Sequence, residues 1–164
     1  MSSIPNNTEI IVRKGERTLL LYREGRLERS YPLVLGRNWS ADKAMEGDEA
    51  TPLGEFYICA KNPRSRYFLS MCISYPNEED AARGIAAGLI TPREHADILA
   101  AIRGRTMPPQ HTALGGEIYI HGHGEVEAGD TVKDWTHGCI ALANPAMRDL
   151  YDLVGLGTTV IIGD

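Results

Sequence analysis

The sequence predicts a mainly β fold, a β-rich α+β domain with a helical hairpin inserted between strands. Short runs of β-branched and aromatic residues recur along the chain, separated by turn residues such as Gly, Asp and Asn. One long block, at about 77–104, changes to the three- and four-residue spacing of helices. The 164 residues suffice for one domain that buries a core without disulfides. We therefore expect a single domain over 1–164, in which a curved mixed sheet or β-sandwich encloses a short helix.

The N-terminal part has the pattern of a β-meander. Its three strands are expected at Glu9–Lys14, Thr18–Arg23 and Arg26–Leu35. The spacing of Leu19, Leu21 and Leu27 indicates that these side chains share one covered face of the meander. Residues 36–54 then have the Asn, Asp, Gly and Pro content of a loop.

Two further strands precede the helical hairpin and are expected at Glu55–Lys61 and Tyr67–Ser74. Asn77 can cap the first helix of the hairpin, whose first turn is acidic. Thr91 can cap the second helix, because Pro92 follows at the first helical position, and this helix is expected to stop at Gly104. The apolar stripes of both helices predict packing within the domain rather than recognition of a partner.

The C-terminal part places two short strands around a long loop. The strands are expected at Glu117–Ile120 and Cys139–Ala143. Asn144 and Pro145 then begin a short helix that runs to about Leu153, and a last strand is expected at Thr158–Ile162. The Pro- and Gly-containing loop Arg105–Gly116 leads into the first of the two strands and could form a cleft wall beside it, although it could equally be a simple connector.

The residues that can carry chemistry gather in this long loop and at its borders. His121, His123, His137 and Cys139 all lie there, although the whole chain has only five His and three Cys. A Cys becomes a nucleophile when a nearby imidazolium favours its thiolate, which lowers the thiol pKa from about 8.5 to roughly 3.5–7.5. We therefore expect Cys139 as the nucleophile, with a lowered pKa, and His121 as its general base.

Two glycines complete the expected catalytic group. Gly138 lets the backbone approach a substrate carbonyl, so that the amides around Cys139 could stabilise an oxyanion. Gly122 could present its carbonyl oxygen to the far ring nitrogen of His121, which would fix the tautomer of that imidazole.

Four more residues of the segment are candidates for substrate binding. The His137 side chain could face the substrate or tune the thiol, or only its backbone could line the site. Thr136 could orient a neighbouring group through its hydroxyl, and Trp135 could equally anchor the loop. His123 follows His121 by two positions, but the surrounding glycines break the strand alternation. We expect His123 on the loop surface rather than in the catalytic pair.

This combination resembles the signature of the L,D-transpeptidases with a YkuD-like catalytic domain. The signature comprises His121-Gly122 and Thr136-His137-Gly138-Cys139-Ile140. With Asp134-Trp135 in front, it is similar to the murein L,D-transpeptidases of Gram-negative bacteria. Further segments resemble the same family: Thr51-Pro52-Leu53-Gly54-Glu55-Phe56 and Leu150-Tyr151-Asp152-Leu153-Val154 with Gly157-Thr158. The resemblance therefore extends over nearly the whole chain.

The resemblance implies a cysteine acyltransferase of peptidoglycan that needs no cofactor. Cys139 would attack a stem tetrapeptide, form a thioacyl enzyme, and pass the acyl group to a diaminopimelate amine. The product would be a 3-3 cross-link or an attachment to the wall. The resemblance also implies peptidoglycan stem peptides as partners and a periplasmic or cell-envelope location.

Two alternatives remain open at the level of sequence. With water as the acceptor, the protein would be an L,D-carboxypeptidase or a peptidoglycan endopeptidase or amidase. Ala141, where many members of the family carry Arg, and the inserted hairpin keep this alternative open, because cleft walls set the choice of acceptor. The other alternative is a non-catalytic wall-binding or zinc module, since imidazoles and a thiolate are zinc donors. Their spacing is not that of common structural zinc sites, so we expect no metal.

Composition bounds the partners and the compartment. The net charge of −5 argues against nucleic acid as a partner, because phosphate binding requires a basic face. No apolar run is long enough for a membrane span, and Met1–Thr8 lacks the basic start and apolar core of a signal peptide. Export would therefore need a leader outside this sequence or a leaderless route. Cys59 and Cys72 are expected as buried free thiols, with a disulfide between them as the alternative. The sequence does not predict the oligomeric state.

Overall fold

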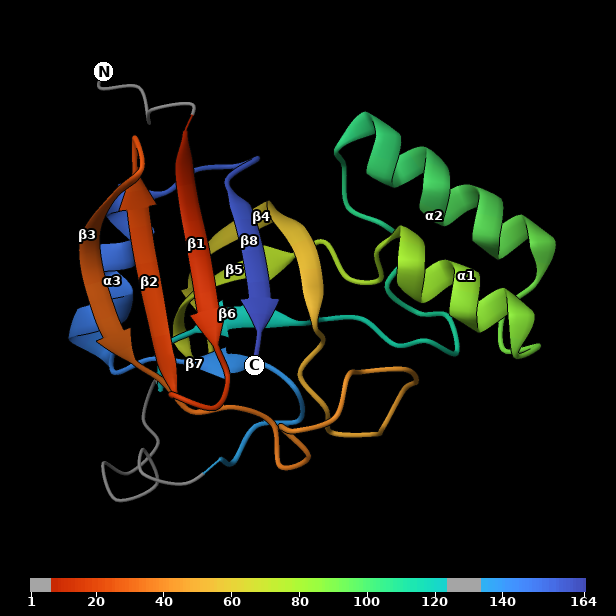
Figure 1. The fold of residues 1–164 in the computed structure, drawn as a ribbon, viewed down its shortest axis with the longest axis horizontal. Coiled ribbons are helices and arrows are strands. Elements are labelled where there is room, and N and C mark those ends of the chain that lie inside the picture. The colour runs from red at the N-terminus through yellow and green to blue at the C-terminus, as the bar shows by residue number, and fades with distance from the viewer. Residues whose placement is uncertain (1–6, 124–133) are drawn as a thin grey trace.

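The computed structural model describes residues 7–123 and 134–164 and shows a mostly β fold with three short helices (Figure 1). The strands are β1 (Thr8–Arg13), β2 (Thr18–Arg23), β3 (Arg26–Pro32), β4 (Gly54–Ser65), β5 (Phe68–Ile73), β6 (Tyr119–His121), β7 (Ile140–Ala141) and β8 (Thr159–Gly163). The helices are α1 (Glu78–Ala86), α2 (Pro92–Gly104) and α3 (Asn144–Leu153).

All the strands join in one mixed sheet with the order β3-β2-β1-β8-β4-β5-β6-β7. The expected meander is confirmed, because β1, β2 and β3 pair antiparallel in sequence order. The C-terminal strand β8 enters between β1 and β4 and runs parallel to β1. At the other edge, the short strands β6 and β7 are also parallel. The two segments that carry the chemistry are therefore neighbours in the sheet.

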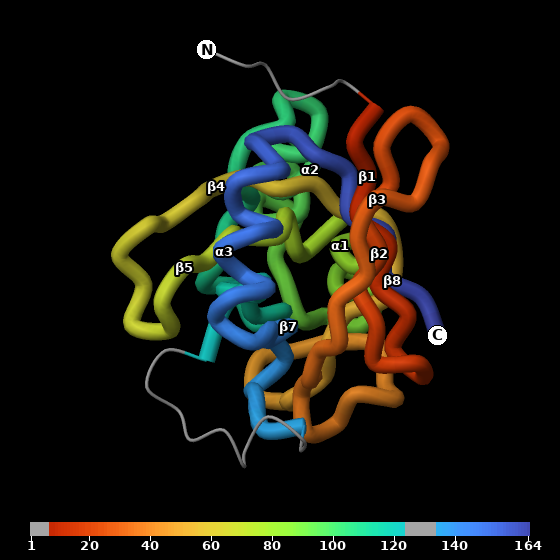
Figure 2. The backbone as a smooth tube through the Cα atoms, turned by 90° about the vertical axis from the view of Figure 1, so that its left-hand side faces the viewer, coloured from red at the N-terminus to blue at the C-terminus, as the bar shows by residue number. Residues whose placement is uncertain are grey.

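The sheet curls until its two edges meet. Val34, just after β3, exchanges two backbone hydrogen bonds of 3.0 Å with Ala141 of β7. A second bridge joins Gly36 to Thr136. In the view of Figure 2, α3 lies between the strands of the two halves of the curl. Its buried side chains Met147 and Leu150 belong to the main apolar core, so α3 is the short core helix that the sequence predicted.

The helical hairpin packs outside the curled sheet, at the right of Figure 1. Both of its helices begin with a capping box, formed by Asn77 with Asp80 and by Thr91 with Glu94. A second, smaller core cluster holds the hairpin and consists of Ala81, Ile90, Ile98 and Leu114. Leu114 comes from the segment that leads into β6, so the hairpin is packed against the wall of the candidate site.

The predicted element types agree with the structure, and their ends shift by a few residues. The prediction for Leu27 is wrong, because this side chain is 54% exposed while Leu19 and Leu21 are fully buried. A bulge between Leu21 and Tyr22 shifts the register, so that Leu27 lies opposite Tyr22. Leu27 therefore shares the outward face of Tyr22 and not the covered face of Leu21.

Replacing Leu114 tests whether the hairpin is fixed to the site wall. Leu114 is 1% exposed and its methyl groups press against the backbone of Gly84 on α1. We expect Leu114→Ala to lower the free energy of unfolding by about 2–5 kcal/mol, because it leaves a cavity. Leu156→Ala is the matched control, and since Leu156 is 68% exposed, its change should stay within about 0.5 kcal/mol. Equal urea midpoints for the two variants would contradict this packing.

Candidate active site

The parallel pairing of β6 with β7 brings Cys139 and His121 to the same face of the sheet. Ile120 pairs with Ile140 and His121 with Ala141, so Cys139 stands beside Tyr119, two positions before His121. Ile120 and Ile140 point into the core, and the alternation turns Cys139 and His121 to the opposite face. With a rise of about 3.3 Å per residue, the offset along the strands is about 6.6 Å. The register thus places the expected nucleophile and base on adjacent strands, two residues apart along the strand direction.

The Cys139 thiol opens into a cleft of about 300 Å³. Its sulfur donates to the carbonyl oxygen of Glu117 and accepts from the amide of Tyr119, each at 3.4 Å. The residues that line the cleft are Lys43, Glu46, Gly47, Glu49, Gly116, Glu117, Ile118, His137 and Cys139. Gly116 ends the loop that was considered as a possible cleft wall, and it does line the cleft.

The expected low pKa of Cys139 is wrong for the described structure. Burial raises the pKa of the Cys139 thiol to about 11, and the hydrogen bond from Tyr119 and the charge of Lys43 only partly oppose this. No hydrogen bond joins the thiol to His121 within residues 7–123 and 134–164. The resting site therefore holds a neutral thiol.

His121 is held by the main-chain carbonyl that the sequence indicated. Its Nδ1 lies 2.6 Å from the carbonyl oxygen of Gly122. Since a carbonyl oxygen only accepts, Nδ1 carries the hydrogen and Nε2 keeps its lone pair. A Cβ at Gly122 would lie 2.6 Å from Oδ1 of Asn144 and 2.9 Å from the carbonyl oxygen of Tyr67. Only glycine fits in this position.

An aromatic wall buries His121. Tyr67 stacks on its ring with centroids 4.5 Å apart, and Trp135 lies 5.8 Å away. The imidazole is 3% exposed, and this burial lowers its pKa to about 4. His121 is therefore a neutral imidazole over the whole physiological range of pH, which suits a general base rather than the cation of an ion pair. Tyr67 could not be expected from the sequence, because nothing local marks it as a neighbour of His121.

A hydrogen-bonded turn presents Cys139. The Thr136 hydroxyl donates to the carbonyl oxygen of Cys139 at 2.7 Å and accepts from the amide of Gly138 at 3.2 Å. Thr136 is 2% exposed, so its side chain orients the turn and is covered from the cleft. Gly138 has φ +126°, and a Cβ there would lie 2.7 Å from the carbonyl oxygen of Ala50. Close packing against this neighbouring loop requires glycine.

Asp134 anchors the beginning of the same segment. Its carboxylate accepts two hydrogen bonds from Arg17, at 2.6 and 3.1 Å, and a third from the amide of Leu35 at 2.9 Å. Arg17 lies in the turn between β1 and β2 and stacks over Trp39 at 3.9 Å. The pair ties the site segment to the far end of the sheet. No local pattern marks Arg17 as a partner of Asp134, since 117 positions separate the two residues.

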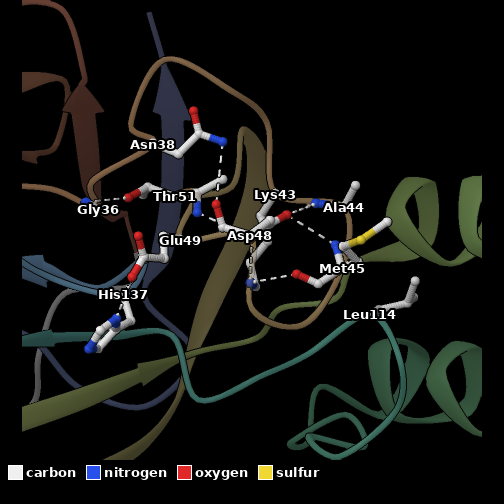
Figure 3. Close-up of polar contacts among 12 residues, drawn as sticks. Gly36, Asn38, Lys43, Ala44, Met45, Asp48, Glu49, Thr51, Leu114 and His137 are labelled. Carbon is white, nitrogen blue, oxygen red and sulfur yellow. Dashed lines mark hydrogen bonds and ion pairs between the residues drawn. The ribbon is translucent and has the colours of Figure 1, made fainter.

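His137 points outward from the turn and contacts a carboxylate. Its Nδ1 lies 2.9 Å from Oε1 of Glu49, and its side chain is 77% exposed (Figure 3). Glu49 belongs to the loop before β4, which Asp48 organises by accepting from the amides of Ala44, Met45 and Ala50. Lys43 adds an ion pair of 2.9 Å with Asp48. The structure thus brings His137 to the cleft, together with a carboxylate that sequence analysis missed.

His123 is not on the surface, which corrects the sequence interpretation. It is 6% exposed, its amide donates to Oδ1 of Asn144 at 2.8 Å, and its ring lies 5.9 Å from that of Trp135. Nδ1 of His123 and Nε1 of Trp135 are buried without a hydrogen-bond partner in the described parts of the chain. Trp135 thus packs between the two imidazoles. Most of the loop that joins His123 to Trp135 lies outside the described residues.

The remaining predictions concern Ala141, the other thiols and metal binding. Ala141 is fully buried between β6 and Val34, so it makes no contact with the cleft. Cys59 and Cys72 are free thiols on neighbouring strands, and the Cys59 thiol donates to the carbonyl oxygen of Cys72 at 3.5 Å. Within the described ranges, no three His, Cys, Asp or Glu side chains gather as metal ligands. No helix in the same ranges could cross a membrane.

Comparison with known proteins places this fold. The helical cell shape determining protein Pgp2 from Campylobacter jejuni superposes with a TM-score of 0.68 at 23% identity, over 98% of this chain and 48% of Pgp2. Bd1075 from Bdellovibrio bacteriovorus superposes with a TM-score of 0.61 at 20% identity, over 96% of this chain and 48% of its own. An L,D-transpeptidase from Mycobacterium smegmatis superposes with a TM-score of 0.57 at 16% identity, over 96% of this chain and 59% of its own. This chain thus spans about half the length of such structures. A search among curated proteins found no match.

The curled sheet around a core helix is the fold of the L,D-transpeptidase catalytic domains. The family model for the YkuD L,D-transpeptidase catalytic domain matches residues 7–162. The chain therefore belongs to the YkuD L,D-transpeptidase family, and the resemblance seen in the sequence is confirmed.

The raised pKa of Cys139 predicts an unusual order of thiol labelling. At pH 7 we expect iodoacetamide to modify Cys59 before Cys139, because a side-chain hydrogen bond from the Cys72 thiol lowers the pKa of Cys59, whereas burial raises that of Cys139. The Cys139 rate should rise about tenfold per pH unit up to its pKa, since only the thiolate reacts. Peptide mass spectrometry at several pH values measures both rates, with Cys139→Ala as the assignment control. Fastest labelling of Cys139 at pH 7 would show that its thiolate is preformed.

Burial of neutral His121 predicts a loss of stability in acid. The folded pKa, about 4, lies below the ordinary value of 6.5, so the unfolded chain takes up the proton first. Keeping His121 neutral therefore contributes to the free energy of unfolding fully above pH 6.5. This contribution, about 3 kcal/mol, is lost as the pH falls from 6.5 towards 4. Urea unfolding at pH 7 and pH 4.5 should show a smaller acid loss for His121→Gln than for wild type. His95→Gln, on α2 away from the site, should lose as much stability between pH 7 and pH 4.5 as the wild type does. An equal loss in all three proteins would refute the burial argument.

Proposed function

We propose that the protein is a cysteine acyltransferase that acts on peptidoglycan stem peptides as an L,D-transpeptidase. The observation that carries the proposal is the parallel register of β6 and β7, which sets Cys139 beside a cleft and on the same sheet face as His121. Membership of the YkuD L,D-transpeptidase family supports the choice of substrate. The cell envelope, and in a Gram-negative cell the periplasm, is the location that this substrate requires.

Acylation begins from a neutral thiol and a neutral imidazole. Cys139 attacks the carbonyl carbon before the terminal D-amino acid of a tetrapeptide, while Nε2 of His121 takes the thiol proton. The carbonyl of Gly122 holds Nδ1 and stabilises the imidazolium that forms. This imidazolium then protonates the departing amine of the D-amino acid. A thioester on Cys139 remains.

The backbone of the turn supplies the stabilisation of the oxyanion. The Gly138 amide already donates to the Thr136 hydroxyl, so it is not directed at the cleft. We therefore assign the oxyanion donor to the amide of Cys139 itself, which the Thr136 turn holds in place. The sequence indicated the amides around Cys139 as a group, and this assignment selects one of them.

The second half-reaction transfers the acyl group to an amine, such as the side-chain amine of diaminopimelate on another stem. Amine attack on the thioester forms the amide bond of a 3-3 cross-link and releases the thiol. If water attacks instead, the product is a tripeptide and the protein is an L,D-carboxypeptidase. The same nucleophile serves both outcomes, so product analysis decides between them.

Incubation with a purified disaccharide-tetrapeptide tests the proposal. Mass spectrometry should find a dimer that is lighter than two monomers by one D-alanine, and Cys139→Ala should form none of it. Cys59→Ala is the matched control and should retain activity, because Cys59 lies two strands away from the site. Loss of the nucleophile typically costs a factor of about 10⁶ in rate, beyond detection here. A tripeptide alone would assign the carboxypeptidase, and no product from wild type would refute the peptidoglycan assignment.

A further inference from the structure

The cleft beside Cys139 contains an imidazole that the acylation step does not use. His137 lines this cleft, whereas His121 is buried behind Tyr67 and Trp135 and is not among its lining residues. The His137 side chain is 77% exposed, against 3% for His121 as a whole. A second substrate that enters the cleft after acylation therefore meets His137 first.

Glu49 gives this imidazole a defined orientation and tautomer. Its Oε1 lies 2.9 Å from Nδ1 of His137, as the close-up in Figure 3 shows. A carboxylate only accepts, so Nδ1 carries the hydrogen and Nε2 has a free lone pair. His121 has the same tautomer, but its partner is a neutral carbonyl. A carboxylate partner also stabilises the imidazolium that forms when Nε2 takes up a proton.

Glu49 is itself fixed before any substrate arrives. Its backbone adopts φ +57°, which is uncommon for a residue other than glycine, and its carbonyl oxygen accepts from the amide of Asn38 at 3.1 Å. Arg37 approaches its carboxylate to 3.6 Å. The neighbouring Asp48 binds three amides and Lys43, and so holds the loop in shape (Figure 3). The contact between Glu49 and His137 therefore rests on a structured loop.

The charge of the cleft suits an amine acceptor. Three carboxylates, those of Glu46, Glu49 and Glu117, line the cleft, and the single lysine there is buried in an ion pair with Asp48. An acceptor amine is an ammonium ion at neutral pH, so carboxylates favour its entry. It must then lose protons before its nitrogen can form an amide. The cleft thus offers both attraction for the cation and a base.

We propose that His137 is the general base of the acceptor half-reaction and that Glu49 is its positioning residue. The inference rests on the proposed function, since it concerns how the thioester is consumed. The ammonium loses its first proton to water in the cleft. The amine nitrogen then bonds to the thioester carbonyl while Nε2 of His137 takes the second proton. The carbon–sulfur bond breaks, and the imidazolium returns that proton to the sulfur of Cys139, which restores the thiol.

The test separates formation of the thioester from its consumption. Single-turnover reactions with the disaccharide-tetrapeptide measure acylation by intact-protein mass, and added amines then measure aminolysis against hydrolysis. In His137→Gln and Glu49→Gln, acylation should stay within about threefold of wild type. Aminolysis by a second tetrapeptide should fall about 10²-fold or more in His137→Gln and about tenfold or more in Glu49→Gln. The product ratio should shift towards the tripeptide.

Three controls make the result specific. Glu46→Gln removes a carboxylate from the same cleft without touching His137, so its aminolysis should fall less than that of Glu49→Gln. Glu49→Asp keeps the charge and should recover part of the aminolysis rate. Hydroxylamine, which is already unprotonated at pH 7, skips only the proton that goes to water, so its reaction with the thioester should still be slower in His137→Gln than in wild type. Thermal unfolding checks that the exposed His137 can be replaced without loss of the fold.

The outcomes distinguish the two levels of the proposal. A thioester that forms and undergoes aminolysis equally well in wild type, His137→Gln and Glu49→Gln would overturn the role of His137. If the aminolysis rate falls equally in Glu46→Gln and Glu49→Gln, Glu49 acts only through the negative charge of the cleft and does not position His137. If wild type forms no thioester at all, the proposed function fails, and this inference fails with it.

Discussion

The seam where the curled sheet closes on itself is the constraint on which the candidate site depends. Val34 and Ala141 exchange backbone hydrogen bonds there, and Thr136 is paired with the segment that follows β3. Because β7 has only two residues, it could not hold its register by itself. The closure fixes β7 from both sides and thereby fixes the position of Cys139 relative to His121.

Close approach of three backbones supports this seam. A Cβ at Gly36 would lie 2.3 Å from the carbonyl oxygen of Glu49 and 2.9 Å from Cα of Gly138. A Cβ at Gly138 would in turn meet Ala50. The two glycines let the loop before β4 press against the turn that presents Cys139. This contact also delivers Glu49 to His137, so one packing requirement serves both the seam and the cleft.

Buried cations hold this loop to the rest of the sheet. The Lys14 ammonium, at the end of β1, donates to the carbonyl oxygens of Trp39, Ala41 and Thr51. Burial lowers its pKa to about 8, which leaves it largely protonated at neutral pH. Arg17, in the next turn, holds Asp134 at the other side of the seam. Charged side chains of the meander therefore brace both segments that flank Cys139.

Burial also explains why the chemistry differs from the expectation for a reactive Cys. An imidazolium–thiolate pair needs solvation or strong hydrogen bonds, whereas the Tyr67 and Trp135 rings exclude water from His121. Removal of solvent favours the neutral forms of both the thiol and the imidazole. A neutral thiol beside a neutral imidazole is therefore the resting form of the site.

The sequence by itself determined the strands, the capped helices and the local chemistry. Asn77 and Thr91 begin their helices as their capping boxes require, and the contact between His121 and the carbonyl of Gly122 joins adjacent residues. These features depend on neighbours along the chain, which periodicity and spacing report directly.

Only the tertiary structure decided how distant parts meet. The contacts of Glu49 with His137 and of Arg17 with Asp134 join residues 88 and 117 positions apart, which no local pattern encodes. The bulge that exposes Leu27 and the burial that raises the pKa of Cys139 also arise from packing. Cys139 could therefore be named from the sequence as the candidate nucleophile, whereas its protonation state and its cleft followed from the closed sheet.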